Sequence, residues 1–204
     1  MKSRLEQGFE ALGLVVEEAQ LGRLLGYLDL IEKWNRVYNL TAIRDKEKMV
    51  AHHLLDSLSI VPYVNARRCA DVGSGAGLPG IPLAIMKPDM AVVLIESNGK
   101  KAAFIRQTII ELGLDNASVE ARRVETVEGK RFDAVVSRAF ADTALFARLA
   151  LPICASGGML LAMKGQHREL SDLPEEIVEA SMIPLHVPFL EGERHLVMMK
   201  TKSE

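Results

Sequence analysis

Two periodicities of hydrophobic and polar residues divide the chain into two parts. In the first part, apolar residues recur three or four positions apart, as at Leu21, Leu24 and Leu28, which places them on one face of a helix. A second helix is predicted to follow Asp45, whose side chain suits the capping position. Residues 1–63 are therefore predicted to form a helical extension.

The second part, residues 64–204, alternates short apolar runs with helical segments. Strand-like runs are expected at residues 69–72, 91–95, 117–121, 132–136 and 159–163. Helices are expected at residues 79–86, 99–112, 142–154 and 168–180. This alternation predicts right-handed crossovers and a parallel sheet with helices on both faces.

The end of the chain has a different pattern. Two strand-like runs, Pro184–Phe189 and His195–Thr201, are separated by a short polar link, which predicts an antiparallel hairpin. The expected fold is therefore α/β: a mostly parallel sheet with an antiparallel C-terminal hairpin, and a helical extension packed on the sheet as part of one structural unit.

Composition narrows the class of protein. With 49% hydrophobic and 25% charged residues, the chain belongs with globular rather than disordered proteins. A net charge of −2 excludes a globally basic nucleic-acid coat but allows a local basic face. We find no signal peptide and no apolar run of the ~18 residues that a membrane span needs, so a cytoplasmic protein is expected. Cys69 and Cys154 form no metal-binding or disulfide pattern.

A glycine-rich loop follows the first predicted strand and precedes a helix. Gly75, Gly77 and Gly80 fit a dinucleotide fingerprint, with a helix N-terminus for a pyrophosphate. Asp71, followed by Gly73, Gly75 and Gly77 at every second position, instead fits the loop of S-adenosylmethionine enzymes. A purely structural glycine turn is the alternative to both.

Three features favour the S-adenosylmethionine loop. A carboxylate at Asp71 would repel a pyrophosphate but can hold the ammonium of S-adenosylmethionine, directly or through water. Glu96 closes the second predicted strand, where an acid hydrogen-bonds ribose hydroxyls. The antiparallel hairpin is unusual in dinucleotide folds and typical of methyltransferase sheets. A nucleoside cofactor is therefore the favoured ligand.

Several motifs together resemble a known family. They are Trp34-Asn35 with Tyr38-Asn39-Leu40-Thr41, His52-His53-Leu54-Leu55-Asp56-Ser57-Leu58, Asp71 to Pro82, Lys100-Lys101-Ala102-Ala103-Phe104, Arg123-Val124-Glu125 and Ser137-Arg138-Ala139. This set resembles the bacterial 16S ribosomal RNA 7-methylguanosine methyltransferases, long called glucose-inhibited division protein B. The matching blocks run from about residue 30 to 165. One departure is Glu96-Ser97-Asn98, where the family commonly has an Asp-Ser pair.

The resemblance implies a class I methyltransferase fold and a reaction. S-adenosyl-L-methionine would be the methyl donor, S-adenosyl-L-homocysteine its product, and ring nitrogen seven of one guanine in 16S ribosomal RNA the acceptor. That nitrogen carries an in-plane lone pair, so the reaction needs alignment of the reacting groups and no general base. The chemistry is compatible with a chain that offers no convincing catalytic dyad.

The resemblance and the predicted strand ends together assign candidate cofactor residues. They are Asp71, Gly73, Gly75, Gly77, Leu78, Glu96, Ser97, Asn98, Val124, Glu125 and Arg138. Arg138 is also expected to position or electrostatically assist methyl transfer. Alternatives remain: helix-start packing for Leu78, a solvated loop charge for Glu125 and a surface salt bridge for Arg138.

A basic rim is expected around the cofactor site, because ligands bind beyond the carboxyl ends of the strands in open α/β sheets. Its candidate RNA-binding residues are Lys100, Lys101, Arg123, Lys164 and Arg168. The acids expected on helices elsewhere are Glu17, Glu18, Asp172, Glu175, Glu176 and Glu179. Such a rim would bind phosphates and make RNA binding salt-sensitive. Scattered solubilising charges are the alternative.

His52 and Asp56 share one face of a predicted helix and are expected to pair, tying the extension to the sheet. No further ligands accompany them, so no metal site is expected. The expected partner is 16S ribosomal RNA, naked or in the small subunit, and the expected state is a monomer. Other hypotheses are a methyltransferase for another RNA, a protein or a small molecule, an NAD-dependent oxidoreductase, and a catalytically silent RNA-binding or cell-division partner.

Overall fold

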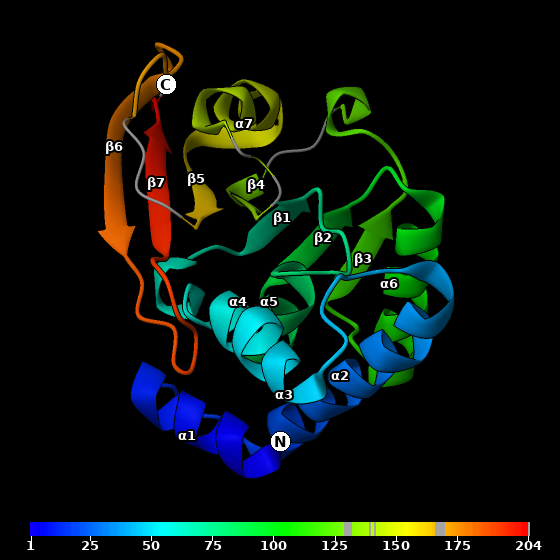
Figure 1. Cartoon of the computed structure of the whole chain (residues 1–204). Coiled ribbons are helices and arrows are strands. Elements are labelled where there is room, and N and C mark those ends of the chain that lie inside the picture. The colour runs from blue at the N-terminus through cyan, green and yellow to red at the C-terminus, as the bar shows by residue number, and fades with distance from the viewer. Residues whose placement is uncertain (129–131, 139, 141, 166–169, 204) are drawn as a thin grey trace.

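Seven strands form one central sheet in the computed structural model, which describes residues 1–128, 132–138, 140, 142–165 and 170–203. The strand order is β3-β2-β1-β4-β5-β7-β6. The strands are β1 Arg68–Val72, β2 Ala91–Ile95, β3 Ala117–Glu120, β4 Phe132–Ser137, β5 Cys154–Lys164, β6 Ile177–Pro184 and β7 His195–Thr201. β1 to β5 are parallel, and β7 runs antiparallel to both β5 and β6 (Figure 1).

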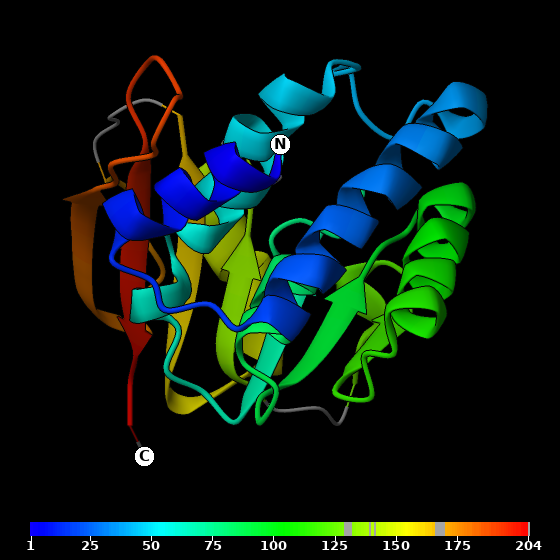
Figure 2. The same ribbon diagram turned by 90° about the horizontal axis from the view of Figure 1, so that it is seen from below.

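Helices cover both faces of this sheet. They are α1 Lys2–Leu12, α2 Glu18–Tyr38, α3 Lys46–Met49, α4 Asp56–Leu58, α5 Gly80–Met86, α6 Gly99–Leu112 and α7 Thr143–Ala150. A π-helical turn at Val50–Leu55 joins α3 to α4. α7 lies on one face, and α1 to α6 lie on the other, where Figure 2 shows α1 and α2 outermost.

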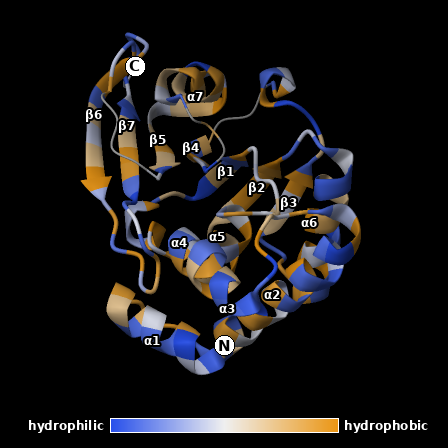
Figure 3. Ribbon diagram, in the orientation of Figure 1, coloured by the Kyte–Doolittle hydropathy of each residue, from blue (hydrophilic) through white to orange (hydrophobic). Residues whose placement is uncertain are grey.

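Each face of the sheet has its own hydrophobic core. Cys69 of β1 belongs to the core beneath α1 to α6, whereas its neighbour Ala70 belongs to the core beneath α7. Successive side chains of a strand point to opposite faces, so a sheet buried on both sides needs apolar residues at nearly every strand position. Figure 3 shows this as hydrophobic colour along the central strands and mixed colours on the covering helices.

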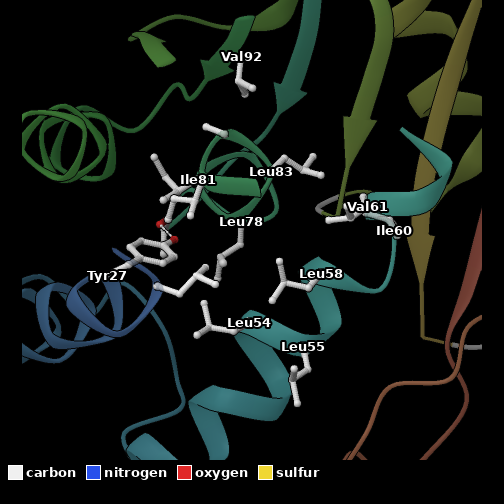
Figure 4. Close-up of a cluster of buried hydrophobic side chains, with 14 of the residues drawn as sticks. Tyr27, Leu54, Leu55, Leu58, Ile60, Val61, Leu78, Ile81, Leu83 and Val92 are labelled. Carbon is white, nitrogen blue, oxygen red and sulfur yellow. Dashed lines mark hydrogen bonds between the residues drawn. The ribbon is translucent and has the colours of Figure 1, made fainter. Parts of the chain in front are cut away.

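The helical extension contributes directly to the first core. Figure 4 shows Tyr27 from α2, Leu54 and Leu58 from the α3–α4 segment, and Leu78 and Ile81 from the loop and α5 packed together. All five are at most 3% exposed. The extension therefore covers the face of the sheet from which the glycine loop emerges.

The structure confirms most of the predicted elements. Asp45 caps α3 by accepting a hydrogen bond from the backbone N–H of Glu47 at 2.8 Å. The five parallel strands and a terminal antiparallel hairpin are present, but the strand predicted at Pro184–Phe189 is wrong. The strand that pairs with β7 is β6, Ile177–Pro184, and residues 185–189 belong to the link. β5 begins at Cys154, five residues earlier than predicted, so α7 ends at Ala150.

The helix predicted at residues 168–180 is wrong. Residues 166–169 lie outside the described residues, and among residues 170–180 the structure has strand β6 from Ile177 onward instead of a helix. β6 is the edge of the sheet and mostly exposed. Its exposed positions carry the apolar Val178 and Ala180 as well as the polar Glu179 and Ser181, so hydrophobicity marks no buried face. The acids Asp172, Glu175, Glu176 and Glu179 are consequently not helical, and the hairpin link spans residues 185–194.

Candidate functional site

Asp71, at the end of β1, anchors the glycine loop to the start of α5. Its Oδ2 accepts a hydrogen bond from the backbone N–H of Gly80 at 2.8 Å, and its side chain is fully buried. A Cβ atom on Gly80 would lie 2.7 Å from that same oxygen, so only glycine allows this approach. Oδ1 of Asp71 is buried and has no hydrogen-bond partner among the described residues.

Glu96, at the end of β2, joins two loops at the edge of the sheet where the parallel strands end, here called the carboxyl edge. Its Oε2 accepts from the backbone N–H of Gly75 at 2.7 Å, and its Oε1 accepts from that of Asn98 at 2.7 Å. The side chain is buried. Each carboxylate oxygen has two lone pairs, so both oxygens of Glu96 can accept a further hydrogen bond from a hydroxyl group.

Tyr27 supports the loop from the helical extension and was not predicted as a site residue. Its buried hydroxyl donates to the carbonyl of Ala76, and its ring lies 6.5 Å from that of Phe104 on α6. In the sequence, Tyr27 lies on the apolar face of a helix and looks like any other core residue. No sequence signal distinguishes it.

A cavity of about 160 Å³ lies beside the glycine loop at the carboxyl edge. Gly73, Ser97, Val124 and Glu125, four of the predicted cofactor residues, line it together with Arg123. It is bounded by the ends of β1 and β2 and the segment after β3, where a ligand is expected in such sheets.

Two other predicted cofactor residues have structural roles. The side chain of Leu78 is 3% exposed and packs in the core beneath the loop (Figure 4), which is the packing alternative. The side chain of Asn98 caps α6 by accepting from the backbone N–H groups of Lys100 and Lys101. These two positions shape the site without lining the cavity.

Arg138, directly after β4, lines a second and larger cavity of about 330 Å³. Its Nη1 donates to Oδ2 of Asp56 and to the backbone carbonyl of His52, both at 3.0 Å. Oδ1 of Asp56 accepts from Nε of Arg194 at 3.2 Å. Asp56 thus ties the helical extension to the sheet through two arginines and not through the expected pairing with His52.

Burial shifts two pKa values near the loop in opposite directions. It raises the pKa of Asp71 to about 7, although the Gly80 and Ser74 hydrogen bonds and the charge of Arg138 act against this. Burial, followed by the charge of Arg138, lowers the pKa of His53 to about 4. His53 is therefore a neutral imidazole at neutral pH, with Nε2 3.0 Å from the hydroxyl oxygen of Thr41.

The predicted basic residues divide by position. Lys100 and Arg123 are exposed and Lys101 half-buried, all beside the carboxyl edge. Lys164 is only 8% exposed and donates to the carbonyl of Phe140 at 2.7 Å, so it belongs to the wall of the larger cavity and not to an exposed rim. Arg168 lies outside the described residues.

Two structural features are absent from the residues that the structure describes. Among them, no helix combines the length and hydrophobicity that crossing a membrane requires. Nor do three or more histidine, cysteine or acidic side chains in these ranges group as metal ligands would.

Sequence comparison places the chain among proteins of one family. A family model described as GidB, rRNA small subunit methyltransferase G, matches residues 20–197. A ribosomal RNA small subunit methyltransferase G from Nitrosospira multiformis is 50% identical, over 99% of this chain and 98% of the relative. One from Neisseria gonorrhoeae is 47% identical, over 98% and 99% of the two chains.

Solved structures show the same fold at low identity. An O-methyltransferase from Bacillus cereus, in complex with S-adenosylhomocysteine, matches with a TM-score of 0.60 and 16% identity, covering 87% of this chain and 91% of that one. The O-methyltransferase TomG from Streptomyces achromogenes, in complex with S-adenosylmethionine, matches with a TM-score of 0.60 and 17% identity, covering 96% and 94%. The fold is that of class I S-adenosylmethionine-dependent methyltransferases.

Proposed function

The chain belongs to the rRNA small subunit methyltransferase G family, and from that premise we propose that it methylates ring nitrogen seven of one guanine in 16S ribosomal RNA. Family membership identifies a methyltransferase of small-subunit ribosomal RNA. The choice of guanine and of its nitrogen seven follows from the resemblance of the motifs. The proposed methyl donor is S-adenosylmethionine, which family and fold support.

The residues at the carboxyl edge fit this donor. The buried Oδ1 of Asp71 lacks a partner among the described residues, as a carboxylate intended for an ammonium group would. Glu96 lies at the end of β2, where an acid binds ribose hydroxyls, and is fixed there by two backbone hydrogen bonds. Val124 and Glu125 line the adjoining cavity on the side expected for the adenine.

The reaction needs positioning more than proton transfer. When bound, S-adenosylmethionine supplies an electrophilic methyl group, and guanine nitrogen seven already has a free lone pair. The chain's task is to hold donor and acceptor in line, which contributes roughly 7–11 kcal/mol when the geometry is good. His53, with a pKa of about 4, is neutral at neutral pH and lines the larger cavity together with Arg138.

One observation carries the proposal: three functional elements converge at the carboxyl edge. The loop held by Asp71, the carboxylate of Glu96 and the guanidinium of Arg138 follow β1, β2 and β4, and β1 pairs with both other strands. Arg138 follows Ser137, whose hydroxyl donates to the carbonyl of Val72 just before the loop, and Arg138 also lines the larger cavity.

The remaining expectations belong to the same proposal. The proposed substrate is ribosomal RNA, free or in the small subunit, and we propose a cytoplasmic location on that ground. We propose a monomer that uses no metal. Lys100, Lys101 and Arg123 are the proposed RNA-binding residues beside the cofactor cavity.

The test is methyl transfer with methyl-labelled S-adenosylmethionine. Small-subunit ribosomal RNA from a strain that lacks the enzyme is supplied both naked and as assembled subunits. Nuclease digestion and mass analysis then locate the label. We expect 7-methylguanosine at a single position, and the better of the two substrates identifies the form of RNA used.

Two results would contradict the proposal. Label on another atom or another base would show that the enzyme methylates a different position of ribosomal RNA. No label, despite measured S-adenosylhomocysteine binding, would leave the fold and cofactor in place but assign the substrate to another RNA or to a small molecule. A parallel incubation with NADH, for which we expect no binding, excludes the oxidoreductase hypothesis.

A further inference from the structure

The 330 Å³ cavity lies between the helical extension and the sheet. His52, His53 and Asp56 line it from the extension, Arg138 and Lys164 from the ends of β4 and β5, and Arg194 from the β6–β7 link. No described residue lines both this cavity and the 160 Å³ cavity of the predicted cofactor residues. The two cavities therefore have separate walls.

A single carboxylate holds two guanidinium groups in the wall of this cavity. Asp56 accepts from Arg138 on one oxygen at 3.0 Å and from Arg194 on the other at 3.2 Å. The side chain of Asp56 is 6% exposed, whereas those of Arg138 and Arg194 are 27% and 26% exposed. The acid is buried and the two cations face the opening.

Both arginines retain hydrogen-bond donors for a ligand. Within the described part of the chain, Arg138 uses only Nη1, which leaves Nε and Nη2. Arg194 uses Nε and Nη1, the latter to the carbonyl of Glu193, which leaves Nη2. Two positive charges against one negative charge leave an excess of one cation. A guanidinium fork held in place is the geometry that binds phosphate oxygens.

We propose that this cavity binds a phosphodiester group of the substrate RNA. The inference rests on the proposed RNA substrate and assigns a ligand to the second cavity. The excess positive charge favours an oxyanion and disfavours the guanine itself, which becomes cationic on methylation. Because Arg138 adjoins the cofactor loop, a phosphate bound here fixes the neighbouring nucleotide beside the methyl donor.

The carboxylate of S-adenosylmethionine is the competing oxyanion. Of the candidate cofactor residues, Gly73, Ser97, Val124 and Glu125 line the other cavity and only Arg138 lines this one, which favours the RNA phosphate here. The experiment below separates the two, because a phosphate site affects RNA affinity and a carboxylate site affects cofactor affinity.

The test measures binding by the variant Arg194→Gln to unmethylated 16S ribosomal RNA over a series of salt concentrations. We expect affinity to fall about tenfold, the loss of one charge-assisted contact. The slope of log affinity against log salt should become shallower by about 0.7 to 0.9, the value for one phosphate contact. Affinity for S-adenosylhomocysteine should not change. Arg194→Lys, which keeps the charge, should keep most of the slope.

Arg148→Gln is the matched control, because Arg148 is exposed on α7, on the opposite face of the sheet. We expect it to leave affinity and slope unchanged. An unchanged slope in Arg194→Gln would overturn the proposal, as would a loss of S-adenosylhomocysteine affinity with intact RNA binding.

Two further measurements keep the test decisive. If Arg194→Gln fails to fold, the arginine Nε–H resonances of the wild-type chain are followed by NMR. RNA should then shift the Arg194 resonance, and a shift of Arg194 caused by S-adenosylhomocysteine but not by RNA would overturn the proposal. Methylation by the wild-type chain tests the proposed function separately. If the protein binds RNA through this cavity but methylates another atom, the proposed function is contradicted and the phosphate site is not.

Discussion

Oδ2 of Asp71 accepts a hydrogen bond from the backbone N–H of Gly80, 2.8 Å away and nine residues later in the chain. This bond closes the glycine loop onto the first turn of α5. The same carboxylate leaves Oδ1 buried without a partner among the described residues. One residue therefore both shapes the loop and offers an acceptor to the proposed cofactor.

Replacing Gly80 with alanine should damage both functions of the loop. The added Cβ would lie 2.7 Å from Oδ2 of Asp71 and 2.7 Å from Cδ2 of Leu94, so the loop or the strand must shift. We expect a loss of about 1–3 kcal/mol in the free energy of unfolding, as for other overpacked cores, and weaker S-adenosylhomocysteine binding. Urea unfolding and calorimetric titration measure the two effects.

Gly22→Ala is the matched control. Gly22 lies in α2, is exposed, and an added Cβ there meets no atom within 4 Å. Alanine in a helix interior is favoured over glycine by roughly 0.5–1 kcal/mol, so this variant should be more stable than the wild type. Equal behaviour of the two variants would show that the close approach of Gly80 to Asp71 is unimportant.

Asp71 and His53 should give opposite dependences of stability on pH. Burial raises the pKa of Asp71 from 3.8 to about 7, so the folded chain holds a proton that the unfolded chain releases, and this contribution to stability is lost as pH rises to about 7. Burial lowers the pKa of His53 from 6.5 to about 4, so its contribution is lost as pH falls towards 4. Between these values the two largely cancel.

Single substitutions separate the two contributions. In Asp71→Asn, the free energy of unfolding should rise with pH between about pH 5 and 6.5, because only the His53 contribution remains. In His53→Gln, the free energy of unfolding should fall over the same range. Either slope is at most about 1.4 kcal/mol per pH unit, the value for one proton. Urea unfolding at several pH values measures this, with the exposed His186→Gln as the control. If both variants showed the wild-type slope of unfolding free energy against pH, the opposite contributions of Asp71 and His53 would be refuted.

The strand ends could be predicted from the sequence because they follow apolar runs. Asp71 and Glu96 each close such a run, and parallel strands end at one edge, so their proximity follows from the pattern alone. The edge strand β6 could not be recognised, because its exposed positions carry apolar residues such as Val178 as well as polar ones, so no buried face stands out. The false helix at residues 168–180 came from that ambiguity.

The contacts of Asp56 with Arg138 and Arg194 could not be predicted from the sequence. Asp56 and Arg194 are separated by 138 positions and meet only because the hairpin link folds back over the helical extension. No spacing rule connects them. The sequence indicated that Asp56 ties the extension to the sheet, but assigned it the wrong partner, since His52 offers its backbone carbonyl and not its ring.

Asp56 and Arg138 should be energetically coupled. Removing either partner leaves a largely buried charge, so Asp56→Asn and Arg138→Gln each cost stability, while the double variant costs less than their sum. We expect a coupling energy of about 0.5–3 kcal/mol from the double-mutant cycle. Methyl transfer should fall about a hundredfold in Arg138→Gln, because small misplacements in an aligned site have effects of that size.

The exposed pair of Lys2 and Glu18 provides the control cycle, at a similar N–O distance of 2.8 Å. Solvent screens that pair, so its coupling should be near zero. If the effects of the Asp56 and Arg138 substitutions were additive, their contact would be no stronger than a surface salt bridge. That was the alternative left open for Arg138 by the sequence.

Tyr27→Phe should weaken cofactor binding from a position outside either cavity. The substitution keeps the ring beside Phe104 and removes only the hydroxyl that donates to Ala76. The orphaned carbonyl should cost about 1 kcal/mol of stability and lower S-adenosylhomocysteine affinity a few-fold. Tyr38→Phe, at a 41% exposed position, is the control and should change neither quantity. Unchanged cofactor affinity in Tyr27→Phe would limit Tyr27 to a packing role.

Reversing the charges of Lys100 and Lys101 should weaken RNA binding far more than cofactor binding. Asn98 caps α6 through their backbone N–H groups, and Lys100 is exposed and Lys101 half-buried beside the carboxyl edge. The double variant Lys100→Glu, Lys101→Glu should flatten the salt dependence of RNA affinity by about 0.7 to 0.9 per lost phosphate contact. The control reverses Lys200 and Lys202, two exposed lysines at the opposite edge, and should bind RNA normally. A parallel loss of RNA and S-adenosylhomocysteine affinity would contradict phosphate binding, because it would mean that α6 itself had shifted.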